Sequence, residues 1–267
     1  MPHKDYHLQV GKAGEQRLNL LNSIYNTSSF KFLESLRLDQ FKSALEVGSG
    51  TGDLTIWIAE HIHKDGILYS IDQSAQQLEI CRKKMQQKQI NNIRLKQMNV
   101  LEIDQLPIRF DFIYCRWLLV HIPNYKEVVE KLFSLLNPGG VLVCEDGVIG
   151  ACSCNPVNQY FEQWKDNIAN AFKIDGRDFW FGNKLLNLFQ HVEAKNIIVN
   201  EFQPILNKEE KDVIKLSIVE TKNYFMQKNI LKSEKEYLNL LNGVRELEND
   251  QYIIKHILNK TVAGFKL

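Results

Sequence analysis

Three alternating glycines between an apolar strand and an apolar helix constrain this chain more than any other feature. The segment Ala44–Val47 is typical of a short buried strand, and Leu54–Ile62 has the apolar content of a helix. Gly48, Gly50 and Gly52 lie between them. Because glycine adopts backbone conformations that other residues avoid, such a turn can present bare N–H groups at a helix start, where anionic groups bind. The sequence therefore predicts a ligand-binding turn, and a tight turn without a ligand is the alternative.

The spacing of these glycines separates two classes of ligand. Dinucleotide enzymes use G-x-G-x-x-G, whereas this turn reads G-x-G-x-G and has Asp53 at the position that would complete the longer pattern. The carboxylate of Asp53 repels a bound pyrophosphate, which carries two negative charges. A ligand with a single carboxylate can instead be held further along the loop. Asp72, at the end of the next predicted strand, is suited to accept hydrogen bonds from both hydroxyls of a ribose. A helix cap is the other interpretation of Asp72, although Ser74 with Gln77 already forms a capping box.

Short β-rich runs alternate with helical segments from residue 43 onwards, which predicts an α/β fold with a Rossmann-like, doubly wound and mostly parallel sheet. Proline and glycine at residues 137–140 are expected to end the helix before them. The expected strands of this core are Ala44–Val47, Ile67–Ile71, Ile93–Gln97, Phe110–Cys115 and Val141–Glu145, and the expected helices are one directly after Asp72 and one over Tyr125–Leu136.

The two ends of the chain are predicted to add helices to this core. Two amphipathic helices are expected before residue 40. The later elements are expected to be a helix started by Asn155-Pro156, a helix at Lys184–Gln190, a strand at Ile197–Phe202, helices at Lys208–Gln227 and Glu234–Leu247, and a final strand at Thr261–Leu267. We therefore expect an N-terminal helical cap over residues 1–40, a core over 41–207, a helical insertion over 208–258 that acts as a lid, and the final strand of the core sheet over 259–267.

Charge and cysteine content narrow the partners and the compartment. The 33 basic and 32 acidic side chains give a formal charge of +1, so no broad positive field is available to hold a nucleic acid. Five cysteines and a start without an apolar leader favour the cytoplasm, and no apolar stretch reaches the ~18–20 residues that cross a bilayer. Cys152-x-Cys154 has no second pair at zinc spacing, so we expect free thiols in a loop and no metal. The oligomeric state leaves no signature in the sequence.

Several of these segments together resemble the class I S-adenosylmethionine-dependent methyltransferases. The segments are Ala44–Gly52, Ile71-Asp72 and Leu136–Gly140, and the resemblance spans about residues 43–146. The chain is similar in particular to small-molecule methyltransferases of the type 11 kind, which Gly11–Leu21, Gly182–Phe189 and the final strand also resemble. The resemblance implies a seven-stranded sheet with the last strand antiparallel and S-adenosylmethionine across the carboxyl ends of the first strands.

The resemblance also assigns cofactor contacts. Glu46 matches the acidic residue at the methionine amino end, Gly48 and Gly50 match glycines packed against the cofactor, and Asp72 matches the ribose acid. At the end of the third strand the family has an acidic residue for the adenine amino group, whereas this chain has Asn99. The full expected cofactor set is Glu46, Gly48, Ser49, Gly50, Asp72, Gln73, Asn99, Val100, Cys115 and Arg116.

Asn99 departs from the family pattern, and we expect it to weaken adenine recognition without abolishing it. Its side-chain oxygen can accept from the adenine amino group, and the N–H of Val100 can meet the ring. After the fourth strand, the segment from Tyr114 to Pro123 resembles the family segment that borders the methionine moiety and the substrate. Within it, Cys115 and Arg116 are the expected contacts.

Methyl transfer from a sulfonium is a displacement, so the protein chiefly aligns the reacting groups and needs no obligatory base. His121 is the candidate base for a hydroxyl or amine acceptor, and a capping or packing histidine is the alternative. Trp117, Trp180 and Tyr6 are the candidate substrate contacts, although the aromatic segment around Trp180 is equally explained as a hydrophobic plug. Arg17 is expected to pair with a carboxylate, or to form a surface salt bridge.

The sequence therefore predicts an enzyme that transfers a methyl group from S-adenosylmethionine to a small molecule. It leaves open the identity of the acceptor and of the atom that is methylated. The alternatives are a noncatalytic S-adenosylmethionine-binding or scaffolding protein, a methyltransferase acting on tRNA or protein, and a NAD-dependent oxidoreductase, which Asp53 disfavours.

Overall fold

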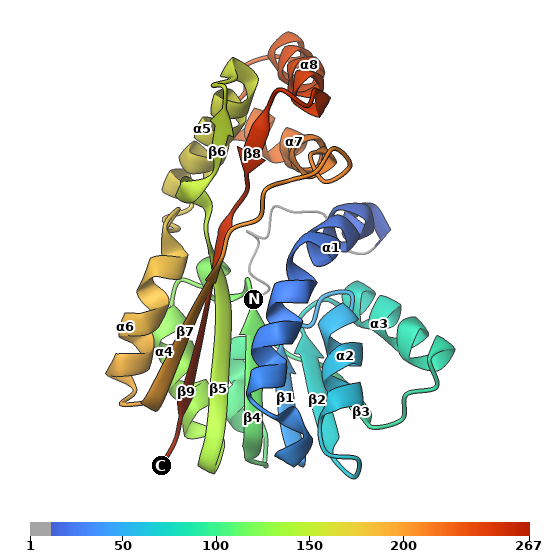
Figure 1. Ribbon diagram of the computed structural model, residues 1–267, viewed down its shortest axis with the longest axis vertical. Coiled ribbons are helices and arrows are strands. Elements are labelled where there is room, and N and C mark those ends of the chain that lie inside the picture. Colours follow the sequence, from blue (N-terminus) through green and yellow to red (C-terminus); the bar gives the residue numbers. More distant parts are fainter. Residues whose placement is uncertain (1–11) are drawn as a thin grey trace. The chain divides into compact units, whose positions relative to one another are not determined.

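Seven strands form one sheet in the computed structural model, which describes residues 12–267 of the chain. Their order is β3-β2-β1-β4-β5-β9-β7, with six strands parallel and the last strand of the chain, β9, antiparallel (Figure 1). The predicted doubly wound sheet with an antiparallel final strand is therefore confirmed. The strands are β1 Ser43–Val47, β2 Ile67–Asp72, β3 Ile93–Gln97, β4 Phe110–Arg116, β5 Leu136–Val148, β7 Lys195–Phe202 and β9 Leu258–Phe265.

The register of the parallel strands brings their carboxyl ends to one edge of the sheet. Val47, the last residue of β1, lies opposite Ile71 on β2 and Cys115 on β4, and Asp72 lies opposite Gln97 on β3. Ligands of open α/β sheets bind outside this edge. The crossover helices that follow these strands are α2 Asp53–His61, α3 Ala75–Gln87 and α4 Tyr125–Ser134, and α6 Leu185–His191 precedes β7.

The chain divides into two compact units. The sheet unit comprises residues 26–146, 182–201 and 260–267, and the described part of the helical unit comprises residues 12–25, 147–181 and 202–259. Helix α1 Lys12–Ser35 contributes residues to both. The other elements of the helical unit are β6 Ser153–Asn155, α5 Gln159–Ile174, α7 Asp212–Gln227, α8 Glu234–Gly243 and β8 Ile253–Lys255. That residues 208–258 act as a lid stays a prediction.

The core of the sheet unit is built from strand residues that are apolar on both faces. Leu45, Leu68, Phe112 and Val143 are all inaccessible to solvent. Such uninterrupted apolar runs are what a parallel sheet covered on both sides requires. Phe41, just before β1, stacks on Phe112 with ring centroids 5.9 Å apart, and this contact fixes the entry of the chain into the sheet.

Several local predictions are wrong. Residues 12–35 form one long helix, α1, where two helices were expected. Asn155-Pro156 does not start a helix, because Asn155 ends β6 and pairs with Ile253 of β8. Helix α5 begins four residues later, where the side chain of Asn158 accepts hydrogen bonds from the N–H groups of Tyr160 and Phe161.

The segments on either side of β6 also differ from expectation. Residues 137–140 lie within β5, which therefore begins five residues before the predicted start at Val141. Residues 208–258 are not helical throughout, since they contain β8. All five cysteines are free and buried, but Cys154 lies in β6 and not in a loop.

Two further findings concern membranes and metals. None of the helices in the described part of the chain is long and apolar enough to cross a membrane. Within residues 12–267, no group of three or more His, Cys, Asp or Glu side chains is arranged to hold a metal ion.

Candidate functional site

The glycine turn after β1 adopts backbone angles that favour glycine. Gly52, at φ +83°, caps α2, and a Cβ atom there would lie 2.3 Å from Sγ of Cys81 on α3. No larger residue fits that position without moving α3. Gly50 has φ +54°, but a Cβ atom on it would meet nothing within 4 Å. The turn is thus closed against α3 at Gly52 and open at Gly50.

The N–H groups of this turn are already engaged, which corrects the prediction of bare amides. Gly48 and Ser49 donate to the carbonyl of Ile71, at 2.8 and 3.1 Å. Gly50 donates to Oδ2 of Asp72 at 2.9 Å, and Gly52 donates to the carbonyl of Ser49 at 3.0 Å. These bonds tie β1 to β2 and hold the turn in shape, so ligand recognition falls to its open side and to neighbouring side chains.

Asp72 joins the turn to the start of α3. Its Oδ2 accepts from the N–H of Gly50, and its Oδ1 accepts from the N–H of Ser74 at 2.8 Å. Burial raises the pKa of this carboxyl above its ordinary value, and the two backbone N–H groups oppose the shift. Each oxygen keeps a second lone pair, so the capping contact and a ribose contact are compatible. Gln73, next along the chain, is exposed, and its carbonyl accepts from Nε2 of Gln97.

Glu46 is a buried carboxyl at the end of β1, with only 3% of its surface exposed. Its Oε2 accepts hydrogen bonds from Oγ1 of Thr55 and from Oγ of Ser70, the latter at 3.4 Å. Burial raises the pKa of Glu46 to about 7, against the opposing effects of Thr55, Arg116 and Ser70. Hydrogen bonds from other described residues reach Oε2 only, so Oε1 is available to a cationic group.

Ser49 adds a second unmatched polar atom to the turn. Its hydroxyl is buried and has no hydrogen-bond partner among the described residues. A buried hydroxyl without a partner costs about 1–3 kcal/mol, which a ligand with a donor or an acceptor would offset. Ser49, Oε1 of Glu46 and the open side of Gly50 therefore fit a polar ligand at this turn.

At the end of β3, Asn99 caps the short helix η2 Val100–Gln105. Its Oδ1 accepts from the N–H of Leu101 at 3.0 Å, and Asn99 and Val100 are both half-buried. The capping bond orients the side-chain amide, and the second lone pair of Oδ1 and the Nδ2 donors remain for another partner.

The end of β4 is linked to the second part of α1. Nη1 of Arg116 donates to Oδ1 of Asn26 at 2.9 Å and to Oγ of Ser29 at 3.3 Å. Ser29 in turn donates to Oε2 of the buried Glu145 at 2.9 Å. The Cys115 side chain is buried, with its Sγ 3.4 Å from Sγ of Cys144, so its backbone is the group left for a ligand. Sequence reasoning missed Asn26, Ser29 and Glu145, because no local pattern connects three segments so far apart.

The loop after β4 carries two of the predicted residues. Trp117 has φ +49°, is half-buried, and donates its N–H to the carbonyl of Glu145 at 2.8 Å. The guanidinium of Arg116 lies 5.6 Å from the centroid of its ring. His121 is the half-buried last residue of the short helix η3 Leu119–His121.

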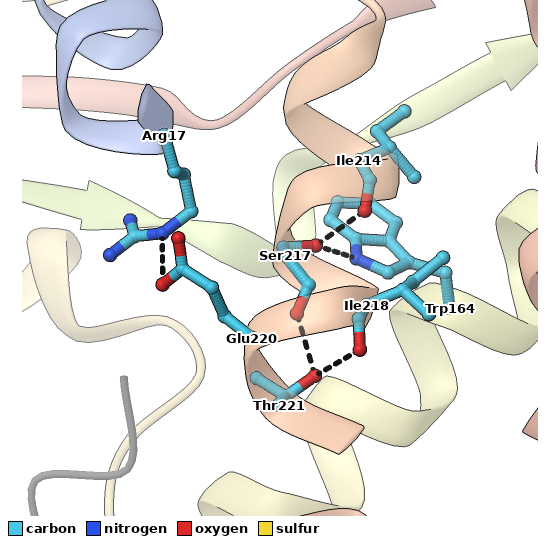
Figure 2. Close-up of polar contacts among 7 residues, drawn as sticks. All are labelled: Arg17, Trp164, Ile214, Ser217, Ile218, Glu220 and Thr221. Atoms are coloured by element: carbon cyan, nitrogen blue, oxygen red, sulfur yellow. Dashed lines mark hydrogen bonds and ion pairs between the residues drawn. The ribbon is translucent and has the colours of Figure 1, made fainter. Parts of the chain in front are cut away.

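The other predicted residues belong to the helical unit or lie outside the description. Trp180 is 51% exposed and packs over Gly150, where a Cβ atom would be 2.4 Å from the indole. Tyr6 lies outside the described residues. Arg17 is buried, and its Nε donates to Oε2 of Glu220 at 2.9 Å, so a surface salt bridge is the wrong interpretation (Figure 2).

Comparison with known proteins defines the class. Residues 38–259 match the family described as methyltransferase domain, and the chain belongs to this family as a class I S-adenosylmethionine-dependent methyltransferase. S-Adenosylmethionine is its cofactor.

Individual relatives are more distant. The chain is 30% identical over 112 residues to a demethylmenaquinone methyltransferase of Geobacillus sp. (strain WCH70), covering 42% of this chain and 48% of that protein. It is also 30% identical over 131 residues to the demethylmenaquinone methyltransferase of Oceanobacillus iheyensis, covering 46% and 55%. The matches thus span about half the length of these curated relatives.

Solved structures agree in fold. The YcgJ protein from Bacillus subtilis gives a TM-score of 0.60 at 15% identity, covering 91% of this chain and 99% of that one. Haemonchus contortus phosphoethanolamine N-methyltransferase 2, solved with phosphomonomethylethanolamine and S-adenosylhomocysteine, gives 0.54 at 15% identity, covering 95% and 53%.

Proposed function

We propose that this methyltransferase binds S-adenosylmethionine at the edge formed by β1, β2, β3 and β4 and transfers its methyl group to a small molecule. The observation that carries the proposal is the grouping of a buried, partly unmatched carboxyl, a half-buried acid and an open glycine at this edge. These three are Glu46, Asp72 and Gly50. The proposed cofactor contacts are Glu46, Gly48, Ser49, Gly50, Asp72, Gln73, Asn99, Val100, Cys115 and Arg116.

Each of the three groups has a distinct proposed part. Oε1 of Glu46 receives the ammonium group of the methionine moiety, because hydrogen bonds from described residues occupy only Oε2. The free lone pairs of Asp72 receive the ribose hydroxyls. The open side of Gly50 lets the cofactor approach the backbone.

The cofactor supplies the activated methyl group, and this chain supplies position and exclusion of water. In the transfer, a lone pair of the acceptor forms a bond to the methyl carbon while the carbon–sulfur pair stays on sulfur, and S-adenosylhomocysteine leaves. Any proton on the acceptor goes to solvent or to a base, for which we propose His121. Trp117, Trp180 and Tyr6 are the proposed substrate contacts.

A small-molecule acceptor is supported by two observations. The formal charge of +1 provides no field for a polyanion such as tRNA. The relatives named demethylmenaquinone methyltransferases are consistent with a small acceptor, although they share only about half their length with this chain.

The test is transfer of labelled methyl from S-adenosylmethionine into a cell extract that is then separated into small molecules, tRNA and protein. We expect label in the small-molecule fraction and none after omission of the enzyme. Label confined to tRNA or to protein would refute the proposed acceptor class.

A further inference from the structure

Arg116 is a cation at the end of β4, and two side chains of α1 hold its guanidinium. Nη1 donates to Oδ1 of Asn26 at 2.9 Å and to Oγ of Ser29 at 3.3 Å, which uses both protons of that nitrogen. Ser29 is 1% exposed, and its hydroxyl donates to Oε2 of Glu145 at 2.9 Å. The amide of Asn26 and the hydroxyl of Ser29 therefore fix one end of a half-buried guanidinium.

Helix α1 presents these two side chains from the face that it packs against the sheet. Asn26, Ser29, Leu33 and Leu36 follow one another at intervals of three and four residues, so they share one face of the helix. Leu33 and Leu36 belong to the same buried core cluster as Tyr114 of β4. All of these residues lie in the sheet unit. The apolar contacts anchor the helix, and the anchored helix determines where Asn26 and Ser29 stand.

Glu46 lies on the same face of the sheet as Arg116. On β1, Glu46 is the register partner of Tyr114 on β4, and Arg116 follows Tyr114 by two residues, so both side chains of β4 point to that face. Arg116 is in turn the register partner of Glu145 on β5. Since β4 lies between β1 and β5, the guanidinium lies between two buried carboxyls, Glu46 and Glu145.

The charge of Arg116 opposes the effect of burial on Glu46. Burial raises the pKa of Glu46 to about 7, and the guanidinium is the largest opposing influence after the hydrogen bond from Thr55 of α2. The titratable and charged groups that act on Glu46 are Asp72 on β2, Cys81 on α3, and Tyr114 and Arg116 on β4. Within this set Arg116 supplies the positive charge, so its placement affects how readily Glu46 ionises.

We propose that Asn26 and Ser29 are positioning residues of the cofactor site, which hold the guanidinium of Arg116 beside Glu46 and so keep Glu46 in the charged form that receives an ammonium group. Without these two contacts the guanidinium can turn towards Glu145, and Glu46 then loses part of the positive charge that favours its carboxylate. The contact between Glu46 and the ammonium group of S-adenosylmethionine rests on the proposed function. The effect of Arg116 on Glu46 needs no cofactor.

The first test measures the ionisation of Glu46 in the free protein. With ¹³C-labelled glutamate, the side-chain carboxyl resonance of Glu46 is assigned by its absence in Glu46→Gln and followed as the pH varies, and the wild-type midpoint is expected near pH 7. Arg116→Gln should raise this midpoint by about one pH unit, since a nearby opposite charge lowers a carboxyl pKa by roughly 1–3 units. Ser29→Ala and Asn26→Ala keep the arginine and should each raise it by about half a pH unit.

Two variants of α1 serve as controls. Ser29→Thr keeps the hydroxyl and should restore the wild-type midpoint. The Ser35 hydroxyl donates to the carbonyl of Phe32 in its own helix, so Ser35→Ala should also leave the midpoint unchanged. If Ser29→Ala does not fold, Asn26→Ala, at a half-buried position, decides the test. An unchanged midpoint in Asn26→Ala and in folded Ser29→Ala would overturn the proposal whatever Arg116→Gln shows, and so would an equal rise in Ser35→Ala.

The second test is calorimetric titration of the same variants with S-adenosylmethionine. A midpoint raised by about half a pH unit lowers the ionised fraction of Glu46 at pH 6 by about threefold, so Ser29→Ala should bind about threefold more weakly there than wild-type protein or Ser35→Ala. A raised midpoint together with a wild-type affinity that does not depend on pH would support the positioning and refute the proposed contact of Glu46 with the ammonium group. An unchanged midpoint with a pH-dependent wild-type affinity would refute the positioning alone.

Discussion

Glu46 should make cofactor affinity depend on pH in a way that a single substitution removes. Its pKa of about 7 in the free protein means that half of the molecules carry a protonated carboxyl at pH 7. Only the carboxylate attracts the ammonium group of the cofactor, so the proton must leave on binding. Lowering the pH from 7 to 6 reduces the ionised fraction from about one half to about one eleventh, which predicts roughly fivefold weaker binding.

The assay is calorimetric titration of S-adenosylmethionine at pH 6.0, 6.5 and 7.0, in buffers of different ionisation enthalpy that reveal the released proton. Glu46→Gln should bind more weakly and without this slope. The variant also serves as a control for protonation of the ligand's own amino group, because α-amino groups titrate near ~7.7–8.0. If wild-type protein and Glu46→Gln show the same slope, Glu46 does not meet the ammonium group and that part of the account fails.

The same carboxyl affects stability in the opposite direction. Between its ordinary value of 4.5 and about 7, folded Glu46 holds a proton that the unfolded chain has lost, so stability falls as the pH rises through this window. The shift corresponds to roughly 3 kcal/mol. Urea unfolding of wild-type protein and Glu46→Gln at pH 5 and pH 8 should therefore show a smaller loss of stability in the variant, and equal losses would refute this.

Three further predictions concern stability. Gly52→Ala should lower the free energy of unfolding in urea by roughly 2–4 kcal/mol, because φ is positive there and the added methyl group overlaps with α3. Gly139→Ala, at φ +80° with nothing within 4 Å, should cost only about 1–2 kcal/mol. Similar losses in the two variants would contradict the overlap at Gly52. The free energy of unfolding should fall as the pH decreases from about 6.5 towards 3, because His256 becomes protonated in the unfolded chain at a higher pH than in the folded protein. His256→Phe should lessen that fall. An unchanged dependence of stability on acid pH in the variant would count against a buried, neutral imidazole. Arg17→Met should cost roughly 3–5 kcal/mol, because it removes the guanidinium that pairs with the buried carboxylate of Glu220. Adding Glu220→Met should restore part of the loss, and a double variant less stable than Arg17→Met would refute this.

The sequence predicts the sheet well because its signals are local. Strands covered on both faces are rich in apolar residues, so a run such as Val141–Cys144, whose four side chains are all inaccessible to solvent, can be recognised from the sequence. The capping boxes are equally local, and Ser74 and Ser233 each accept the N–H bond that their spacing predicts. The G-x-G-x-G turn is recognisable because α3 leaves no room for a side chain at Gly52.

The wrong or missing predictions depend on contacts between distant segments. Asn155 looks like a helix cap until β8, about a hundred residues later, pairs with it as a strand. The glycine turn looks rich in free N–H groups, but the carbonyl of Ile71 and the carboxylate of Asp72 occupy them. Tyr25 and His256 are 231 residues apart, and no periodicity or capping rule relates them.

Gly50→Ala tests most directly whether the glycine turn holds S-adenosylmethionine. The added methyl group meets no protein atom within 4 Å, so it should cost little more than the backbone strain of a positive φ. The added methyl group would occupy space that we propose for the cofactor, so it should weaken S-adenosylmethionine binding by roughly tenfold or more in calorimetric titration. Gly139→Ala, with a similar strain and an equally open surrounding, should bind as wild-type protein does. If Gly50→Ala folds and binds the cofactor with wild-type affinity, the turn is not its binding site.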